Sequence, residues 1–282
     1  MAGPRFAKPF HGVREWAPSP APGHAPERAT TRELLARECT RYAVRLRPGQ
    51  FYSHDTALVL AGCPAPEAWR RVIHVSAHRP AMGPRASGVV GHRLGERERA
   101  AWKVFGLPIE HPARAWVQTS RVWGEDDLIA AADFLVARRR PLVGIQELRD
   151  EARRMRGSVL ESVLDQVRNG SESPTETKLR LLGMHAGLPE PELNLELHDA
   201  GGVFVARVDQ AYPRYRVAVE YDGRQHAFDI AQFERDADRW DAIRALGWTH
   251  VRILAPHLRG DGAPAVAKIR AALTDAGWRP GL

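Results

Sequence analysis

The sequence predicts a mixed α+β/α/β fold in two domains, a helix-rich first domain and a second domain with a mixed sheet flanked by helices. The chain has 282 residues, 44% of them hydrophobic, which is enough for two cores. Helical and strand periodicities alternate along it from Thr31 onward. The polar residues 171–173 interrupt the helical spacing before a proline-initiated helix, so we place the domain boundary between residues 170 and 171.

The N-terminal part divides into an irregular segment and a domain with regular periodicity. Residues 1–27 are rich in proline and have little apolar pattern, which predicts a disordered segment. Residues 28–170 then form the first domain. Its helices are expected at residues 31–38, 53–61, 111–117, 126–135 and 147–170, and its short strands at residues 72–75 and 88–93.

Residues 171–282 have the element order helix, strand pair or triplet, helix and strand. Ser173 is suited to cap the first helix with Pro174 at its first position, and Glu176, three residues after the cap, predicts a capping box. The helix is expected to stop at Gly187. The later elements are apolar strands at residues 203–209 and 217–222 around a turn at 212–215, a helix at 229–246 and a strand at 248–254.

Carboxylates lie at the ends of both apolar strands, where unpaired acids are rare. The two-residue period of a strand places Glu220 and Asp222 on one face, and antiparallel pairing across the turn places Asp209 opposite Glu220. Three adjacent carboxylates repel one another, and a divalent cation relieves that repulsion. Oxygen ligands favour Mg²⁺ or Mn²⁺. The alternative is an ion pair with a neighbouring arginine: Arg207, Arg214 or Arg216.

Several motifs in this half follow one known pattern. They are Ser-Pro-Thr-Glu176, Arg-Val-Asp209, Val-Glu220-Tyr-Asp222-Gly-Arg-Gln225-His226, then Asp236 and Arg239, and finally Gly247-Trp248. The segment Ser173 to Leu258 resembles the restriction-endonuclease-like domain of the PD-(D/E)xK superfamily, and more narrowly the domain related to very-short-patch repair endonucleases. The resemblance implies a Mg²⁺-dependent phosphodiesterase in which Asp209 and Glu220 bind the metal, with Glu176 as the acid from the first helix.

The sequence departs from the superfamily at one position and leaves alternatives at others. The usual lysine two residues after the second-strand acid is replaced by Asp222, which either serves as a further metal ligand or marks a lost activity. His226 or Gln225 is expected to orient the attacking water, and the alternative for His226 is a solvated or hydrogen-bonded side chain. Glu176 alternatively serves as a helix cap alone.

The first domain carries weaker cues. They are Tyr52-Ser-His54-Asp-Thr-Ala57, Gly106-Leu107-Pro108, Pro112-Ala-Arg114-Ala-Trp116 and Asp127-Leu128-Ile-Ala-Ala-Ala-Asp133. They resemble the accessory domain of such nucleases and of abortive-infection antitoxins, which implies a degenerate winged-helix start. The domain's histidines lie on different elements without paired spacing, so we expect no zinc site; they are His54, His74, His78, His92 and His111.

Charge and composition indicate the partners. Residues 171–282 hold 14 Lys and Arg against 16 Asp and Glu, and residues 1–170 hold the remaining 27 against 18, a net charge of +9. A basic first domain suits DNA docking. No apolar run has membrane-spanning length, and only two cysteines occur, so we expect a cytoplasmic protein that does not bind membranes.

Together these observations predict a DNA endonuclease with Mg²⁺ or Mn²⁺ as cofactor, acting in DNA repair or phage defence. The runner-up is a DNA-binding regulator related to antitoxins, whose nuclease fold has lost catalysis. A homodimer or a toxin-type protein partner is compatible with either function.

Overall fold

The computed structural model describes residues 6–16, 29–98, 100–154, 160–223 and 230–281, without the side chains of residues 230–237. The chain is mixed α/β and divides into two compact units. Unit 1 comprises residues 1–136 and 140–167, and unit 2 comprises residues 137–139 and 168–282. The change of unit at residue 168 lies close to the boundary expected at residues 170 and 171. The separate roles assigned to the two domains stay a prediction.

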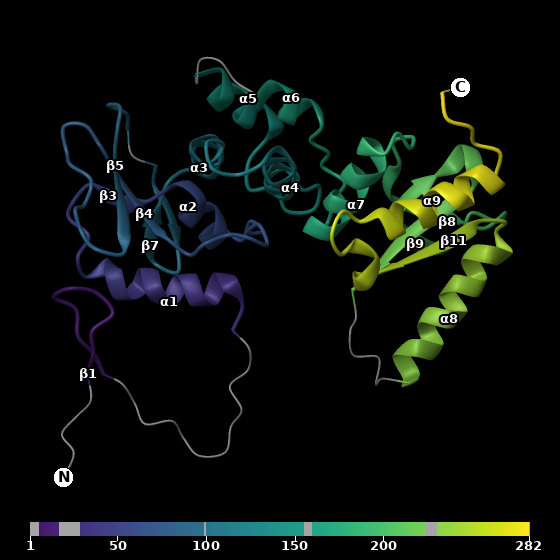
Figure 1. Ribbon diagram of the computed structural model, residues 1–282, viewed down its shortest axis with the longest axis horizontal. Helices are drawn as coiled ribbons and strands as arrows, with labels where there is room; N and C mark the ends of the chain where they lie inside the picture. The colour runs from purple at the N-terminus through teal and green to yellow at the C-terminus, as the bar shows by residue number, and fades with distance from the viewer. Residues whose placement is uncertain (1–5, 17–28, 99, 155–159, 224–229, 282) are drawn as a thin grey trace, which may run out of the picture. The chain divides into compact units, whose positions relative to one another are not determined.

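Unit 1 contains a five-stranded mixed sheet in the order β5-β4-β3-β7-β6 (Figure 1). β3 pairs antiparallel with β4 and parallel with β7, while β4 and β5 are parallel. The strands are β3 (Gln50–Tyr52), β4 (Ile73–His78), β5 (Val89–Leu94), β6 (Trp102–Val104) and β7 (Leu107–Ile109). The helices are α1 (Thr31–Ala43), α2 (His54–Ala61), α3 (Pro112–Thr119), α4 (Glu125–Leu135), α5 (Ile145–Arg154) and α6 (Leu160–Asp165).

Local contacts define the start of α1, the end of α2 and the packing of α3 in unit 1. Thr30 and Glu33 form a complete capping box at α1, since each side chain accepts a hydrogen bond from the other residue's backbone. α2 ends at Gly62, whose φ of 106° lies in the left-handed region that glycine adopts at little cost. Trp116 of α3 is fully buried and donates its indole N–H to the Leu128 carbonyl, which ties α3 to α4.

The described part of residues 1–27 does not support the expected disorder of this segment. Residues 6–16 contain β1 (Phe6–Ala7) and β2 (Glu15–Trp16), which pair antiparallel. The rings of Phe6 and Trp16 meet edge to face, 5.5 Å apart, and this aromatic contact stabilises a pair of strands too short for any periodicity. The remainder of the segment lies outside the described residues.

Unit 2 contains a four-stranded mixed sheet in the order β11-β10-β9-β8. β8, β9 and β10 run antiparallel in succession, and β11 lies parallel to β10 after the crossover through α8. The strands are β8 (Glu192–His198), β9 (Phe204–Tyr212), β10 (Val217–Asp222) and β11 (Thr249–Leu254). The helices are α7 (Pro174–His185), α8 (Ile230–Ala245) and α9 (Ala263–Asp275), with short 3-10 turns η1 (Pro213–Tyr215) and η2 (Ala255–Leu258).

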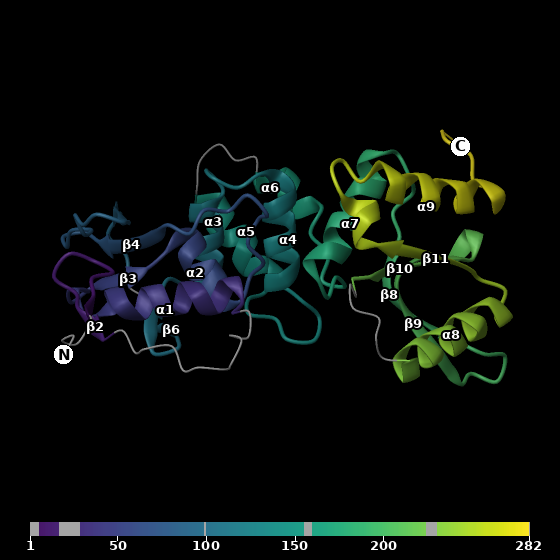
Figure 2. The ribbon, with the colours of Figure 1, turned by 60° about the horizontal axis from the view of Figure 1, so that its bottom comes forward.

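Helices cover both faces of this sheet, as Figure 2 shows for α8 and α9. Val217 and Val219 of β10 pack with residues of α7 and α9, while Ala218 packs with Ile243 of α8. The central strand β10 is therefore buried on both sides. Among the helices of the described residues, none is both long and apolar enough to cross a bilayer.

Candidate functional site

Asp209 and Glu220 lie on neighbouring strands at the centre of the unit 2 sheet. β9 and β10 pair with Ala211 opposite Ala218 and Gln210 opposite Val219, so the next position along the same register brings Asp209 to Glu220. The Tyr221 backbone N–H donates to Asp209 Oδ2 at 2.8 Å, which fixes the Asp209 carboxylate against β10. This register agrees with the predicted opposition of the two acids across the turn.

The environment of Asp209 favours its protonated form. Burial, together with the nearby carboxylates of Glu176 and Glu220, raises the pKa of Asp209 to about 6 against the opposing effects of the Tyr221 N–H and Arg239. Both neighbours are themselves buried, Glu176 at 8% exposure and Glu220 at 6%. Three acids from α7, β9 and β10 thus share one electrostatic neighbourhood.

Glu176 is anchored at the start of α7. Its Oε2 accepts from the Glu172 N–H at 2.8 Å and from Asn194 Nδ2 at 3.2 Å. Ser173 caps the helix as predicted, because its hydroxyl accepts from the Glu176 N–H. The reciprocal half of the predicted capping box is absent among the described contacts, since the Glu176 carboxylate turns to Glu172 and β8. Glu176 is therefore more than a helix cap.

Glu220 is held by two cationic or polar side chains from other elements. Arg239 of α8 donates to Oε1, and His250 Nε2 of β11 lies 2.7 Å from Oε2. His250 is almost fully buried, with 2% of its side chain exposed. Glu220 therefore does form an ion pair, but its partner is Arg239 and not Arg207, Arg214 or Arg216, which the sequence suggested. Arg207 instead pairs with Glu172 at 2.6 Å.

Asp222 is paired with Arg252 of β11, which contacts Asp222 Oδ2 through both Nε and Nη2. The Arg252 guanidinium also lies over the Trp240 ring, 4.5 Å from its centroid, and Trp240 stacks on His250. Arg239 and Arg252 keep 38% and 37% of their side chains exposed. Cationic groups therefore border the two strand-end acids on the α8 side of the sheet.

The described acids lie farther apart than the sequence suggested. Among the described residues, neither Asp209, Glu220 and Asp222 nor a set that includes Glu176 brings three ligand atoms within 4.8 Å of one another; three histidines of unit 1 do. Asp222 is instead paired with Arg252 of β11. Gln225 and His226, predicted to orient water, lie outside the described residues, and their role stays a prediction.

Sequence reasoning missed His250 and the role of Arg239. The sequence places Arg239 among the motifs of the resemblance without assigning it a contact, and it places His250 only within the strand expected at residues 248–254. One signal was present: His250 and Arg252 alternate with apolar residues on β11, so they share the face of β10 that carries Glu220. His250 and Arg252 contact Glu220 and Asp222 only because β11 pairs in parallel with β10, and the alternation alone does not predict this pairing.

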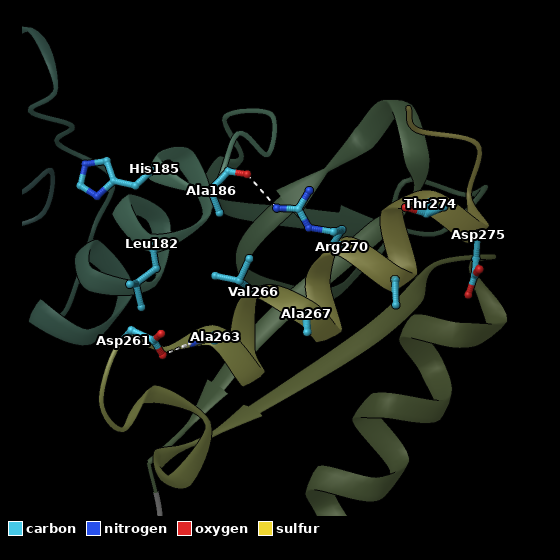
Figure 3. A pocket seen from close by; sticks show the side chains of 11 residues that line it. Leu182, His185, Ala186, Asp261, Ala263, Val266, Ala267, Arg270, Thr274 and Asp275 are labelled. Atoms are coloured by element: carbon cyan, nitrogen blue, oxygen red, sulfur yellow. Dashed lines mark hydrogen bonds between the residues drawn. The ribbon is translucent and has the colours of Figure 1, made fainter. Parts of the chain in front are cut away.

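Unit 2 also has a groove between α7 and α9, of about 680 Å³ (Figure 3). Its lining is mainly apolar and small, with Arg270 donating to the Ala186 carbonyl at 2.7 Å. None of the acids described above lines it. The groove is therefore separate from the candidate site.

The sequence was compared with known proteins. It is 32% identical over 190 residues to an uncharacterized protein of Mycobacterium tuberculosis, found in two strains, and the match covers 67% of this chain and 69% of the relative. No model of a protein family matches the sequence, and no solved structure matches it.

Proposed function

The chain belongs to the same family as that uncharacterized mycobacterial protein, and from the acids of unit 2 we propose that it is a metal-dependent DNA endonuclease. The observation that carries the proposal is the grouping of Glu176 and Glu220 near the buried Asp209, where burial first and the two acids second raise the pKa of Asp209 to about 6. Buried acids that destabilise one another's charge are a feature of functional sites.

The element order of unit 2 supports the finer fold assignment. A helix, three antiparallel strands, a helix and a strand parallel to the third follow one another from α7 to β11. This order agrees with the restriction-endonuclease-like domain that the motifs resemble. Asp209 and Glu220 lie on the second and third strands, and Glu176 lies on the first helix.

The donor set fits Mg²⁺ or Mn²⁺. All three acids offer oxygen, the ligand type that these ions prefer. Among the described contacts, one oxygen each of Asp209 and Glu176 makes no hydrogen bond, whereas both Glu220 oxygens are occupied. Asp222 is the weaker candidate ligand because Arg252 binds it. When bound, the metal would polarise the scissile phosphate and lower the pKa of the attacking water.

The side chains around these acids have separate tasks in the proposed reaction. The Tyr221 N–H and Asn194 hold Asp209 and Glu176 in place. Arg239 is part-exposed, so it would be able to exchange Glu220 for a phosphate oxygen of DNA, and a Glu220 oxygen would then be available to hold the metal. His250 keeps its contact and preserves the orientation of Glu220.

The test is DNA cleavage together with thermal unfolding. Mg²⁺ or Mn²⁺ should raise the melting temperature of the wild type by mass action and support cleavage of single-stranded, duplex or mismatched DNA. Asp209→Asn and Glu220→Gln should remove both effects while leaving DNA binding largely intact. Glu192→Gln is the matched control, because it removes an exposed acid from β8 of the same sheet.

A second function, that of a catalytically inactive DNA-binding regulator, is favoured by the ion pairs of Glu220 and Asp222, which neutralise the strand-end acids. The same assays separate the two. A wild type that binds DNA without metal-dependent stabilisation or cleavage would be the regulator. Asp222→Asn adds detail, since loss of cleavage would place Asp222 in the site and unchanged cleavage would leave the proposed site to the other acids.

A further inference from the structure

Three histidines of unit 1 meet at one point although they come from three separate elements. His54 begins α2, His74 lies on β4 and His92 lies on β5. One ring nitrogen of each lies within 4.8 Å of those of the other two. His74 Nδ1 and His92 Nε2 are 2.8 Å apart, and the rings of His54 and His92 stack at 3.8 Å. The sequence predicted that the histidines of this domain lie apart, and this prediction is wrong for His54, His74 and His92.

The backbone explains the convergence. β4 and β5 are parallel neighbours, with His74 opposite Val90 and His92 opposite Ser76, so both imidazoles project from one face of the sheet. His54 reaches the same face from a φ of 55°, a left-handed conformation that is uncommon for a residue with a side chain. Such conformations persist where the surrounding structure imposes them and are frequent at functional sites.

The second nitrogen of two of these rings faces an acceptor. His54 Nδ1 lies 2.9 Å from the Ser53 hydroxyl, which in turn contacts Ser76 Oγ. His74 Nε2 lies 3.6 Å from Asp55 Oδ1. Asp55 is 5% exposed and is oriented by the Trp69 indole N–H at 2.7 Å. Histidines that bind metals usually donate their other N–H to such a group, which leaves the first nitrogen free for the ion.

One further observation points toward a ligand. Asp55 Oδ1 is buried and has no hydrogen-bond partner among the described residues, so a closer approach of the His74 N–H would satisfy it. Burial lowers the pKa of each imidazole, that of His54 to about 3, which favours the neutral ring. Neutral imidazole is the form that binds metals.

We propose that His54, His74 and His92 form a Zn²⁺ site in unit 1, with Asp55 orienting His74. Three imidazoles are a known zinc ligand set, which leaves a fourth position for water or an anionic oxygen. Tetrahedral Zn²⁺ requires ligand nitrogens about 3.3 Å apart, so the His74 and His92 rings must separate by about half an ångström. This site is distinct from the proposed Mg²⁺ site, because it lies in the other unit and offers nitrogen ligands.

The experiment measures zinc binding by the full chain. Protein stripped with a chelator is titrated with Zn²⁺ against a chromophoric chelator, in millimolar Mg²⁺ so that the acids of unit 2 are occupied. One Zn²⁺ should bind per chain, and Co²⁺ should give the visible absorption of tetrahedral coordination. His92→Gln should weaken zinc binding by roughly 100-fold or more, and Asp55→Asn by roughly 10- to 100-fold.

Matched variants make the result decisive. His78→Gln removes a histidine from the same strand as His74, where its ring nitrogens face the Gly95 carbonyl and Glu110 and its ring lies against Phe51, and should leave zinc affinity unchanged. His92→Cys restores a zinc ligand and should regain most of the affinity if His92→Gln is poorly folded. Asp209→Asn should bind zinc as the wild type does, so failure of the nuclease proposal leaves this one standing. A wild type without zinc affinity, or a His92→Gln variant that matches it, would overturn the proposal.

Discussion

Asp209 combines an ordinary role in a sheet with an unusual electrostatic environment. Its carboxylate accepts a hydrogen bond from the backbone N–H of Tyr221 on the neighbouring strand β10. Its pKa is nevertheless raised, because burial and two further acids disfavour its charge. The charge of Asp209 therefore destabilises the folded protein, and this is the reason for which we propose that Asp209 binds a metal.

This environment predicts a specific pH dependence in the absence of divalent ions. The pKa of Asp209 is raised from 3.8 to about 6, so between these values the folded protein binds more protons than the unfolded chain. The free energy of unfolding should therefore fall as the pH rises from 4 to 6, with a contribution from Asp209 on the order of 2 kcal/mol.

Asp209→Asn isolates that contribution. The variant should gain stability relative to the wild type as the pH rises from 4 to 7, measured by urea denaturation with a chelator present. Added Mg²⁺ should reduce the difference at pH 7, because an ion offsets the repulsion. An equal difference between variant and wild type at both pH values would contradict the raised pKa.

The candidate site was predictable only as far as local geometry reaches. The two-residue period and the turn between β9 and β10 were enough to place Asp209 opposite Glu220. The partners of Glu220 come from α8 and β11. Their contacts depend on how these elements pack against β10, which the spacing of residues along the sequence does not reveal. The histidine group of unit 1 was missed for the same reason, since α2, β4 and β5 contribute one residue each.

Among the secondary-structure elements, the shortest strands were the hardest to predict. α1, α2, α7, α8 and β10 were found because each has a cap, a stop or a sustained period. β3, β6 and β7 span only three residues each and were missed, since alternation cannot be recognised over so short a run. The open choice between a strand pair and a triplet in unit 2 is settled by β8.

α9 was also missed, although it contributes to the core of unit 2. Ala265, Ile269 and Leu273 are fully buried at helical spacing and pack with β10 and β11. Ile269→Ala should therefore lower the free energy of unfolding by about 2 to 5 kcal/mol in urea denaturation, because it removes buried atoms and leaves a cavity. Lys268→Ala, at the exposed neighbouring position, should change it by less than about 0.5 kcal/mol. A small effect of Ile269→Ala would show that α9 is dispensable for unit 2.

On the scale of the whole molecule, charge is divided unevenly between the two parts of the chain. Residues 1–170 carry a net charge of +9, while residues 171–282 carry 14 basic and 16 acidic residues. The acids proposed to bind a metal thus lie in the part without a net positive charge. A polyanion such as DNA would be attracted chiefly to residues 1–170, which is compatible with the proposal that this part binds DNA while unit 2 hydrolyses it.

This division predicts where DNA touches the full chain. Binding to duplex DNA should weaken steeply with salt, because each neutralised phosphate releases a counterion and contributes about −0.9 to the slope of log K against log salt. Photo-crosslinking to duplex DNA followed by mass spectrometry should find most crosslinked peptides within residues 1–170. A nucleic-acid analogue with an uncharged backbone is the control and should bind weakly. Salt-insensitive binding, or crosslinks confined to residues 171–282, would assign DNA recognition to unit 2 and contradict a docking role for the basic part.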